Sequence, residues 1–326
     1  MKQLLARFKP YLRWVILGGT LFFIAKTLKD HWQEVVSIEV SAQAGYWLAV
    51  SFVVTLAAHV WSGWVWHWIL ALFDQPQTGW WSTPVYLKTN VAKYLPGNVW
   101  HFFGRVRALQ KVGAPTGTAV LAVVMEPLLM AVAALVLVGV FGGELGFGRG
   151  GEGEIGGWGD WGLGVRVLVQ LGVLAGALVC VHPRIFNPIL RRLGRAKAKA
   201  QGLGVGDSPR LRAYPVRSLL GEVGFVGLRS LGFILIVAAL TPVTLAAVPT
   251  LIAAFSLAWL LGLVIPGAPG GIGVFEATAI PLLSSHFPVA VVLSSVAIYR
   301  LVSVVAEVVA AALVVLAERI TGKALG

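Results

Sequence analysis

The stretch VIPGAPGGIGVFE, residues 264–276, places two prolines, four glycines and a glutamate inside one of the most hydrophobic regions of the chain. Proline and glycine interrupt helices, and inside a bilayer every backbone N–H and C=O group still needs a hydrogen-bond partner. A break of this kind is tolerated only where it is buried in protein or lines a wet cavity. The stretch therefore indicates a membrane-embedded helix that is interrupted next to an ionisable side chain.

The composition of the whole chain agrees with a membrane location. Of its 326 residues, 57% are hydrophobic and 12% are charged, and the mean hydropathy is +0.82. Several apolar stretches approach or exceed the roughly 20 residues that a helix needs to cross a bilayer, whereas the strands of a barrel are shorter and alternate in polarity. We therefore expect an all-α, polytopic helical membrane protein.

The apolar stretches predict about six full transmembrane helices and two broken segments. The full spans are expected near residues 12–29, 45–72, 114–142, 164–181, 218–243 and 287–317. The broken segments cover residues 80–111 and 247–285. Each of them is either a re-entrant hairpin or a pair of thin spans, because both arrangements return the chain to the side from which it came.

The distribution of charge predicts how these spans are oriented. Residues 182–217 contain nine Lys and Arg side chains against one acidic one, and the first 13 residues contain four more. In the connections at residues 30–44 and 143–163, seven residues are acidic and only Arg149 is a Lys or Arg. Because basic loops stay on the cytoplasmic side, we expect both termini to lie in the cytoplasm. The protein itself is expected to be a multi-pass protein of the cell inner (plasma) membrane. No nucleic-acid-binding motif accompanies the net charge of +12, so we expect no nucleic-acid partner.

The same assignment divides the chain into two halves that enter the membrane from opposite sides. We expect a first transmembrane repeat at residues 1–142, a Gly-rich extracytoplasmic linker at residues 143–163, and a second, inverted repeat at residues 164–326. An odd number of spans in each half produces this inversion. Each half also carries its broken segment after its second span, as an inverted repeat predicts.

The interruptions in the two broken segments occupy corresponding positions in the two halves. A single Pro-Gly kink has an ordinary structural explanation, but paired interruptions are the best sequence pointer to a central binding site. The candidate substrate-binding residues in these interruptions are Pro96, Gly97, Asn98, Pro266, Gly267, Gly270, Gly271 and Gly273.

A charged residue follows each interruption, and the opposite charge follows on the next span. Glu126 comes after Arg105, and Arg300 comes after Glu276. An ionisable residue in a membrane segment is costly enough to suggest a function and a partner of opposite charge. We expect Arg105 to pair with Glu126 and Arg300 with Glu276. The crosswise pairs, and a role limited to packing, remain open at this point.

A polar helix face is predicted after the first interruption. Asn98 would cap a half-helix on which His101 and Arg105 share one face. His101 is either a structural interfacial histidine or a proton carrier. Lys93, Arg105 and Arg300 add positive charge near the interruptions. Together with the free N–H groups at the start of two half-helices, these cations would bind an anion such as a phosphate headgroup.

Two further pairs of charged residues are Glu222 with Arg229 and Arg300 with Glu307. The members of each pair are seven positions apart and therefore share a helix face. We expect Glu222 to be solvated near the cytoplasmic boundary. Arg229 and Glu307 lie deeper in their spans and are further candidates for substrate binding.

Catalytic and metal sites are not indicated by the sequence. His59 and His67 have no companions at metal-ligand spacing, so we expect no metal and no cofactor. No nucleophile is accompanied by a base or a metal cluster, so we assign no catalytic residue and do not expect an enzyme.

Four parts of the chain carry a family resemblance, namely KYLPGNVWHFFGR at residues 93–105, Glu126, PGAPGGIGVFEA at residues 266–277 and YRL at residues 299–301. On these residues the chain resembles the transmembrane-region family of lysylphosphatidylglycerol synthases, also called flippase-like domain proteins. The resemblance covers nearly the whole chain and is strongest in the second broken segment. The first motif departs from the family pattern at Trp100 and His101.

The resemblance implies a membrane domain that moves a lipid, such as an aminoacylated phospholipid or another lipid-linked headgroup, between leaflets. Bifunctional members of the family also carry a soluble aminoacyl-transferase domain. The longest soluble stretch, residues 182–217, is too short to bury a core. We therefore expect a stand-alone member that lacks this domain.

The leading hypothesis is a flippase-like lipid translocator with a polar cavity between the two repeats. A secondary transporter of a small anion and a non-transporting membrane partner of a lipid-modifying enzyme are the alternatives. The expected partners are membrane lipids with anionic or lipid-linked headgroups, while a soluble lipid-modifying enzyme and a homo-oligomer remain open.

Overall fold

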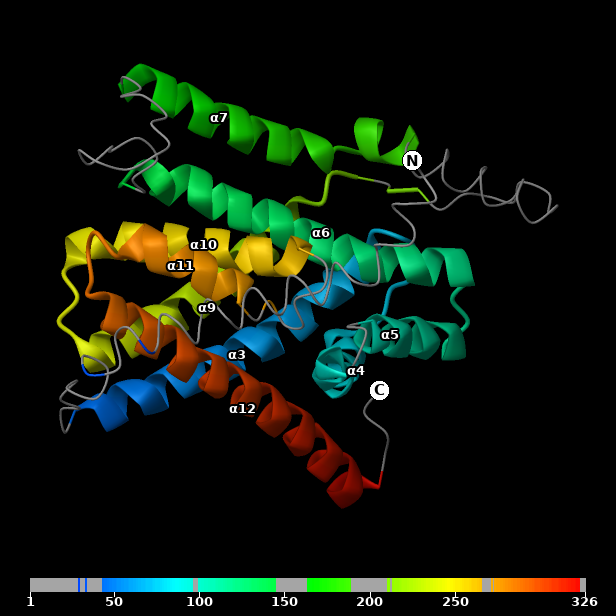
Figure 1. Cartoon of the computed structure of the whole chain (residues 1–326). Helices are drawn as coiled ribbons and strands as arrows, with labels where there is room; N and C mark the ends of the chain where they lie inside the picture. The colour runs from blue at the N-terminus through cyan, green and yellow to red at the C-terminus, as the bar shows by residue number, and fades with distance from the viewer. Residues whose placement is uncertain are drawn as a thin grey trace, which may run out of the picture. The chain divides into compact units, whose positions relative to one another are not determined.

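The computed structural model describes residues 43–95, 99–144, 163–188, 213–265 and 273–322, together with residues 29, 33, 210, 211 and 271 (Figure 1). Every regular element in that part of the chain is a helix, and five of these helices are long and apolar enough to cross a membrane. The protein is therefore an all-α polytopic membrane protein. The expected span at residues 12–29 lies almost wholly outside the described residues, as do most of residues 143–163 and 189–209.

The five long helices are α3 (Ala44–Ala71), α6 (Thr116–Phe141), α9 (Val216–Leu240), α10 with its preceding turn η3 (Leu245–Val264), and α12 (Val289–Thr321). Four of them lie within a few residues of expected full spans, and α7 (Leu163–Cys180) corresponds to a further one. The short turn η2 (Gly142–Glu144) follows α6. The fifth helix, α10, falls in the second broken segment and is long enough to span on its own, which agrees with the pair of thin spans left open for that segment.

The two broken segments consist of separate helices. The first forms α4 (Gly79–Asn90), η1 (Val91–Tyr94) and α5 (Trp100–Lys111), and the second forms α10 (Val248–Val264) and α11 (Val274–Leu283). Leu95 and Ile265 end η1 and α10 in extended conformations, with ψ angles of 148° and 114°. Each of them precedes a proline, whose ring disfavours helical geometry in the residue before it.

The chain forms two compact units. Unit 1 comprises Met1–Thr55, Ala134–Val173 and Val226–Ala306, and unit 2 comprises Leu56–Ala133, Leu174–Phe225 and Glu307–Gly326. Both units draw on both halves of the sequence, and α3, α6, α9 and α12 each contribute residues to both. The inverted repeat expected over residues 1–142 and 164–326 stays a prediction.

The core of unit 1 is an aromatic cluster built by α9, α10, α11 and α12. The rings of Phe233, Phe255, Phe275 and Tyr299 pack with centroids 5.4 to 6.1 Å apart. Buried aliphatic side chains on the same helices surround these rings. Aromatic pairs at such separations add stability beyond their burial, so this cluster fixes α11 and α12 relative to each other.

Glycines allow α10 to approach the chain that precedes α11. A Cβ atom on Gly262 would lie 3.1 Å from the Cα of Gly271, and Gly271 has a φ of +71°. Backbone therefore packs directly on backbone at this point, and Gly271 adopts a conformation that other residues rarely adopt. This contact holds the start of α11 in place.

Unit 2 contains a polar interior. Buried apolar side chains such as Trp66, Leu109 and Met125 lie in the same core as buried polar ones. The Ser82 hydroxyl donates to the Gly63 carbonyl over 3.1 Å and so joins α4 to α3. Thr78 caps α4 by accepting from the Trp81 N–H over 3.2 Å.

Hydrogen bonds also join two residues near the ends of the basic segment, residues 182–217. The Asn187 side-chain amide donates to the Leu211 carbonyl over 3.0 Å and accepts from the Leu211 N–H over 2.8 Å. The Tyr214 hydroxyl donates to the Leu178 carbonyl over 2.9 Å, and burial raises the pKa of this hydroxyl. The chain on either side of residues 188–210 is thus held by hydrogen bonds to other parts of the protein.

Candidate functional site

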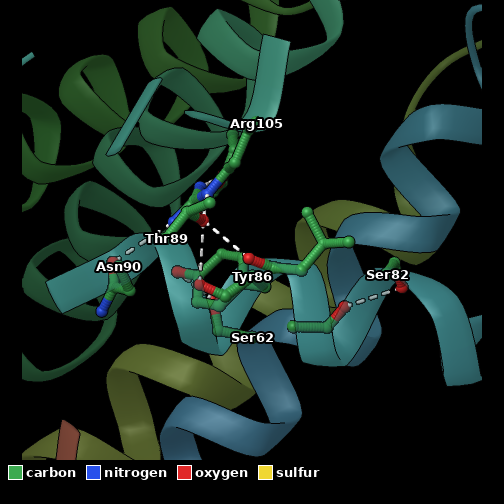
Figure 2. A network of polar contacts seen from close by, with 9 residues as sticks. Ser62, Ser82, Tyr86, Thr89, Asn90 and Arg105 are labelled. Carbon is green, nitrogen blue, oxygen red and sulfur yellow. Dashed lines mark hydrogen bonds and ion pairs between the residues drawn. The ribbon is translucent and has the colours of Figure 1, made fainter. Parts of the chain in front are cut away.

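Arg105 lies at the centre of a buried polar network in unit 2 (Figure 2). The buried face of α5 consists of His101, Arg105 and Leu109, which are four residues apart and therefore fall on one side of the helix. Arg105 is 1% exposed, and its Nη1 donates to Oε2 of Glu126, which is 3% exposed. The predicted pairing of Arg105 with Glu126 is confirmed.

The remaining contacts of Arg105 come from α4. Its Nε donates to the Thr89 hydroxyl over 3.3 Å, and its Nη2 donates to Oδ1 of Asn90 over 3.2 Å. The guanidinium carbon lies 3.8 Å from the centre of the Tyr86 ring, a cation–π contact. Tyr86 is held in turn by the Ser62 hydroxyl at 2.9 Å. The charge of Arg105 is therefore neutralised and enclosed by protein on all these sides.

A second ionic group in unit 2 joins the end of η1 to α12. Nζ of Lys93 lies 2.6 Å from Oε1 of Glu307, and Nε2 of His59 lies 3.2 Å from the same oxygen. The side chains of Glu307 and His59 are 1% and 2% exposed, whereas 23% of the Lys93 side chain is accessible. Two predicted site residues, Lys93 and Glu307, are thus in direct contact.

The ionic pair in unit 1 is built around the start of α11. Arg300 binds Glu276 in a bidentate manner, through Nε on Oε1 and through Nη2 on Oε2 at 3.1 Å. The predicted pairing of Arg300 with Glu276 is confirmed, and the crosswise alternative is wrong. Nη2 of Arg300 also donates to the Gly271 carbonyl over 2.7 Å. The Arg300 side chain is 26% exposed and that of Glu276 is 7% exposed.

Glu276 also occupies the N-terminus of its own helix. Its Oε2 accepts from the Gly273 N–H over 2.6 Å, which satisfies one of the N–H groups left open where α11 begins. Gly273 reaches this geometry with a φ of +85°, a conformation suited to glycine. One carboxylate therefore binds both an arginine and a helix N-terminus, the two kinds of group that bind anions in proteins.

Arg229 lies on α9 and contacts α12 within unit 1. Its Nη1 donates to the Ser303 hydroxyl over 2.9 Å, and its carbonyl accepts from the Tyr299 hydroxyl over 3.0 Å. Its guanidinium carbon lies 5.3 Å from the centre of the Tyr299 ring. These contacts join α9 to α12, and a role of Arg229 in substrate binding stays a prediction.

The predicted site residues fall into two groups. Unit 2 holds Lys93, His101, Arg105, Glu126 and Glu307, and unit 1 holds Arg229, Gly271, Gly273, Glu276 and Arg300. The remaining predicted site residues, Pro96, Gly97, Asn98, Pro266, Gly267 and Gly270, lie outside the described residues. Their role, like that of the other candidates, remains a prediction.

The two half-helices begin slightly later than expected. Helix α5 starts at Trp100 with Val99 in the N-cap position, and Val99 has no side-chain cap bond. Asn98 lies outside the described residues, so a cap by its side chain stays a prediction. Helix α11 starts at Val274, with Gly273 rather than Gly271 at its N-cap. A helix end is the least predictable part of a helix because neighbouring contacts decide where it frays.

The network contains residues that the sequence analysis missed. Tyr86, Thr89 and Asn90 lie three and four residues apart on α4, and this polar face within an apolar segment was the available signal. Glu222 was expected to be solvated, and that expectation is wrong because the side chain is 0% exposed. It lies well inside α9, which begins at Val216.

A shallow hollow of about 200 Å³ lies at the surface of unit 2 between α4 and α5. It is lined by Trp81, Gly104, Arg107, Ala108, Lys111 and Val112. Arg107 and Lys111 are exposed and lie four residues apart, on the side of α5 that faces away from its buried stripe. Within the described ranges, no three His, Cys, Asp or Glu side chains are arranged to hold a metal ion.

The fold and these sites define a helical membrane protein with arginine–glutamate pairs inside its helix bundle. Residues 12–311 match the family model described as the lysylphosphatidylglycerol synthase TM region. The chain therefore belongs to the lysylphosphatidylglycerol synthase transmembrane-region family, as its motifs indicated. The sequence matches none of the curated proteins. Membership of this family indicates a role in the handling of lipids in the membrane.

Proposed function

We propose that the protein is a flippase-like lipid translocator that moves an anionic, aminoacylated or other lipid-linked headgroup between the leaflets. The observation that carries this proposal is the state of Arg300, which is anchored by Glu276 and by the Gly271 carbonyl and still has 26% of its side chain accessible. A cation that is held in place and remains within reach is what the phosphate of a headgroup requires.

Glu276 acts in this mechanism as the resident anion of the site. Its carboxylate engages Arg300 in a fork-to-fork manner and accepts from the Gly273 N–H. A phosphate has oxygens suited to the same donors, so it can replace the carboxylate on Arg300 without leaving the arginine unpaired. Return of Glu276 to Arg300 would then release the headgroup. Arg300 would thus have an anionic partner before and after the exchange.

The cations of unit 2 have different roles in this proposal. Arg105 is enclosed by its partners, so it fixes α4, α5 and α6 to one another and does not itself contact the headgroup. Lys93 is partly accessible and would contact the headgroup. The hollow lined by Arg107 and Lys111 would receive anionic headgroups at the surface, with Trp81 beside them.

The charge bias and the family support a location and a division of labour. We place the protein in the plasma membrane with both termini in the cytoplasm, because the basic segments flank the spans on that side. The chain itself would transport the lipid, and a lipid-modifying enzyme would supply the modified headgroup.

Reconstitution into liposomes tests the proposal. Fluorescent phosphatidylglycerol and lysylphosphatidylglycerol are placed in one leaflet, their appearance in the other leaflet is followed with a membrane-impermeant quencher, and uptake of inorganic phosphate is measured in parallel. Hydrogen bonds to a charged group contribute about 1.5–3 kcal/mol, so Arg300→Gln is expected to slow lipid transfer about 10- to 100-fold. Arg319→Gln, on the exposed end of the same helix, is the matched control and should transfer normally.

Two outcomes would contradict the proposal. Wild-type transfer no faster than in protein-free liposomes, for both lipids, would remove the translocator function. Uptake of inorganic phosphate without lipid transfer would assign the site to a small soluble anion.

A further inference from the structure

Glu222 is a buried carboxyl group that the proposed headgroup site does not use. It lies on α9 in unit 2 and is 0% exposed. Neither of its carboxyl oxygens has a hydrogen-bond partner among the residues that the structure describes. Trp61 covers the neighbouring backbone, since its Nε1 donates to the Gly221 carbonyl over 2.8 Å. The Glu222 side chain is therefore shielded from bulk solvent and has no hydrogen-bond donor among the described residues.

The charged neighbours of Glu222 belong to the Arg105 network. Arg105 on α5 attracts the Glu222 carboxylate, and Glu126 on α6 repels it. Tyr86 on α4 also lies within electrostatic range of Glu222. Two carboxyl groups therefore interact electrostatically with one guanidinium, and that guanidinium donates to Glu126. Glu222 is the carboxyl group that has no hydrogen-bond partner among the described residues.

The other charged groups near this part of α9 are engaged elsewhere. On α9 itself, the guanidinium of Arg217 lies 4.3 Å from the Trp68 ring, and Arg229 donates to Ser303. His59 on α3 packs against Phe225, one turn after Glu222, and is in contact with Glu307. The charge balance at Glu222 is therefore decided by Arg105 and Glu126.

Burial and the lack of hydrogen-bond partners disfavour the charged form of the Glu222 side chain. An ionised carboxylate without water or hydrogen-bond donors costs several kcal/mol, a large share of the stability of a typical domain, and such a group takes up a proton instead. The repulsion by Glu126 acts in the same direction. Burial without hydrogen-bond partners therefore favours the neutral form of the Glu222 side chain.

We propose that Glu222 is a proton-binding site that couples headgroup translocation to the proton gradient. The carboxyl O–H bond breaks when the cycle admits water to the site, the proton passes to a water molecule, and the negative charge stays on Glu222. Arg105 then stabilises that charge, since it can serve either Glu126 or Glu222. This inference rests on the proposed translocator function and names the energy source of that same cycle.

A purely structural residue would not need this chemistry. A leucine or glutamine would fill the same volume without placing a second acid beside Glu126. Two acids that compete for one arginine instead give the network two states that differ by one proton. Uptake and release of that proton would follow the movement of α5 and α6 relative to α9.

Infrared spectroscopy and transport together test the inference. Spectra of the full-length protein reconstituted in lipid at neutral pH are compared for the wild type, Glu222→Gln and the control Glu318→Gln, whose carboxylate pairs with Lys88 at 2.6 Å. We expect the carbonyl band of a protonated carboxylic acid in the wild type and in Glu318→Gln, and its loss in Glu222→Gln. Thermal unfolding should be unchanged in both Glu222→Gln and Glu222→Leu, because the native side chain is already neutral.

Lipid transfer in liposomes is then measured with and without an imposed pH gradient. The gradient should accelerate transfer by the wild type and by Glu318→Gln, whereas Glu222→Gln should transfer lipid at one rate in both conditions. A band that survives Glu222→Gln, or a marked loss of stability in both Glu222 variants, would overturn the proton site. A wild type that transfers lipid without responding to the gradient would overturn the coupling alone. A wild type that transfers no lipid at all would overturn the proposed function and the coupling, while the band would still decide whether Glu222 binds a proton.

Discussion

Arg105 and Arg300 each bind a glutamate, yet the surroundings of the two pairs are opposite. Arg105 is 1% exposed and is surrounded by side chains of α4 and α6, whereas a quarter of the Arg300 side chain, 26%, is accessible beside the backbone of the α11 start. The same pair of residue types thus appears once as a closed contact and once as an open one. A closed pair fixes helices, and an open pair can exchange its partner.

The difference follows from what completes each site. In unit 2, Thr89, Asn90 and Tyr86 use the remaining faces of Arg105, so no donor is directed outward. In unit 1, Arg300 binds the Glu276 carboxylate and the Gly271 carbonyl. Its guanidinium carbon lies 5.7 Å from the centre of the Phe275 ring, and Gly271 has no side chain to place over the arginine. Gly271 therefore leaves space beside the arginine as well as permitting the close approach of α10.

The largest effect is expected from breaking the closed pair. Glu126→Ala removes the carboxylate that Arg105 binds in the observed conformation, and loss of one partner of a buried pair costs about 3–5 kcal/mol. Thermal or denaturant unfolding in detergent measures this loss against wild type. Arg105→Met combined with Glu126→Leu should cost much less than Glu126→Ala, because no unpaired charge remains. Equal losses in the single and the double variant would show that packing, and not charge, dominates the site.

A smaller effect is expected where the backbone of the open site is crowded. Gly271→Ala places a Cβ atom 3.0 Å from the Gly262 Cα at a φ of +71°, and strain of this kind costs about 1–3 kcal/mol. Gly113 has a φ of +93° with nothing within 4 Å of the added atom, so Gly113→Ala isolates the cost of the backbone conformation. Unfolding measurements on both variants separate the two contributions. If Gly271→Ala lowers the free energy of unfolding no more than Gly113→Ala does, the close approach of Gly262 and Gly271 does not contribute to stability.

The open pair is also expected to respond in transport. Glu276→Gln removes the anion that competes with the headgroup for Arg300, so the headgroup should bind more tightly and leave more slowly. We expect the apparent KM for lipid and the maximal transfer rate both to fall, the rate by about tenfold, equivalent to 1.4 kcal/mol. Concentration-dependent transfer in liposomes measures both quantities, with Glu318→Gln as the control. A raised KM at an unchanged maximal rate would mean that Glu276 contacts the substrate directly.

The smallest effect is expected at the surface pair of Lys88 and Glu318. Their side chains are 26% and 20% exposed, and solvent-screened pairs contribute about 0.2–1 kcal/mol. Lys88→Met should therefore change the free energy of unfolding by no more than this. Lys93→Met, at the same 2.6 Å distance from a glutamate, should cost more because Glu307 is buried. A reversal of this order would show that burial of the carboxylate does not set the strength of these pairs.

The sequence was informative wherever the bilayer imposes a cost on a residue. Apolar length predicted α3, α6, α9 and α12, because only a long apolar helix satisfies its backbone in lipid. The cost of an unpaired charge in an apolar segment predicted that Arg105 and Arg300 would each find a glutamate. These predictions needed no knowledge of which helices are neighbours beyond the order of the spans.

The sequence was uninformative where neighbours in space decide the outcome. The contact of Arg105 with the Tyr86 ring and the burial of Glu222 both depend on how α4 and α9 pack, and hydropathy does not report that packing. Charge bias also left open whether residues 247–285 form a re-entrant hairpin or a pair of thin spans, because both return the chain to the same side, whereas α10 is long and apolar enough to span on its own.

The bonds between Asn187 and Leu211 have a consequence for how this protein can vary. Because one amide side chain satisfies both the N–H and the C=O of Leu211, the chain enters and leaves the basic segment at a fixed point. We therefore expect insertions between these two residues to leave the helices on either side anchored, because the entropy of loop closure grows only slowly with length. The segment is thus a natural insertion point for a reporter or an affinity tag on the full-length protein.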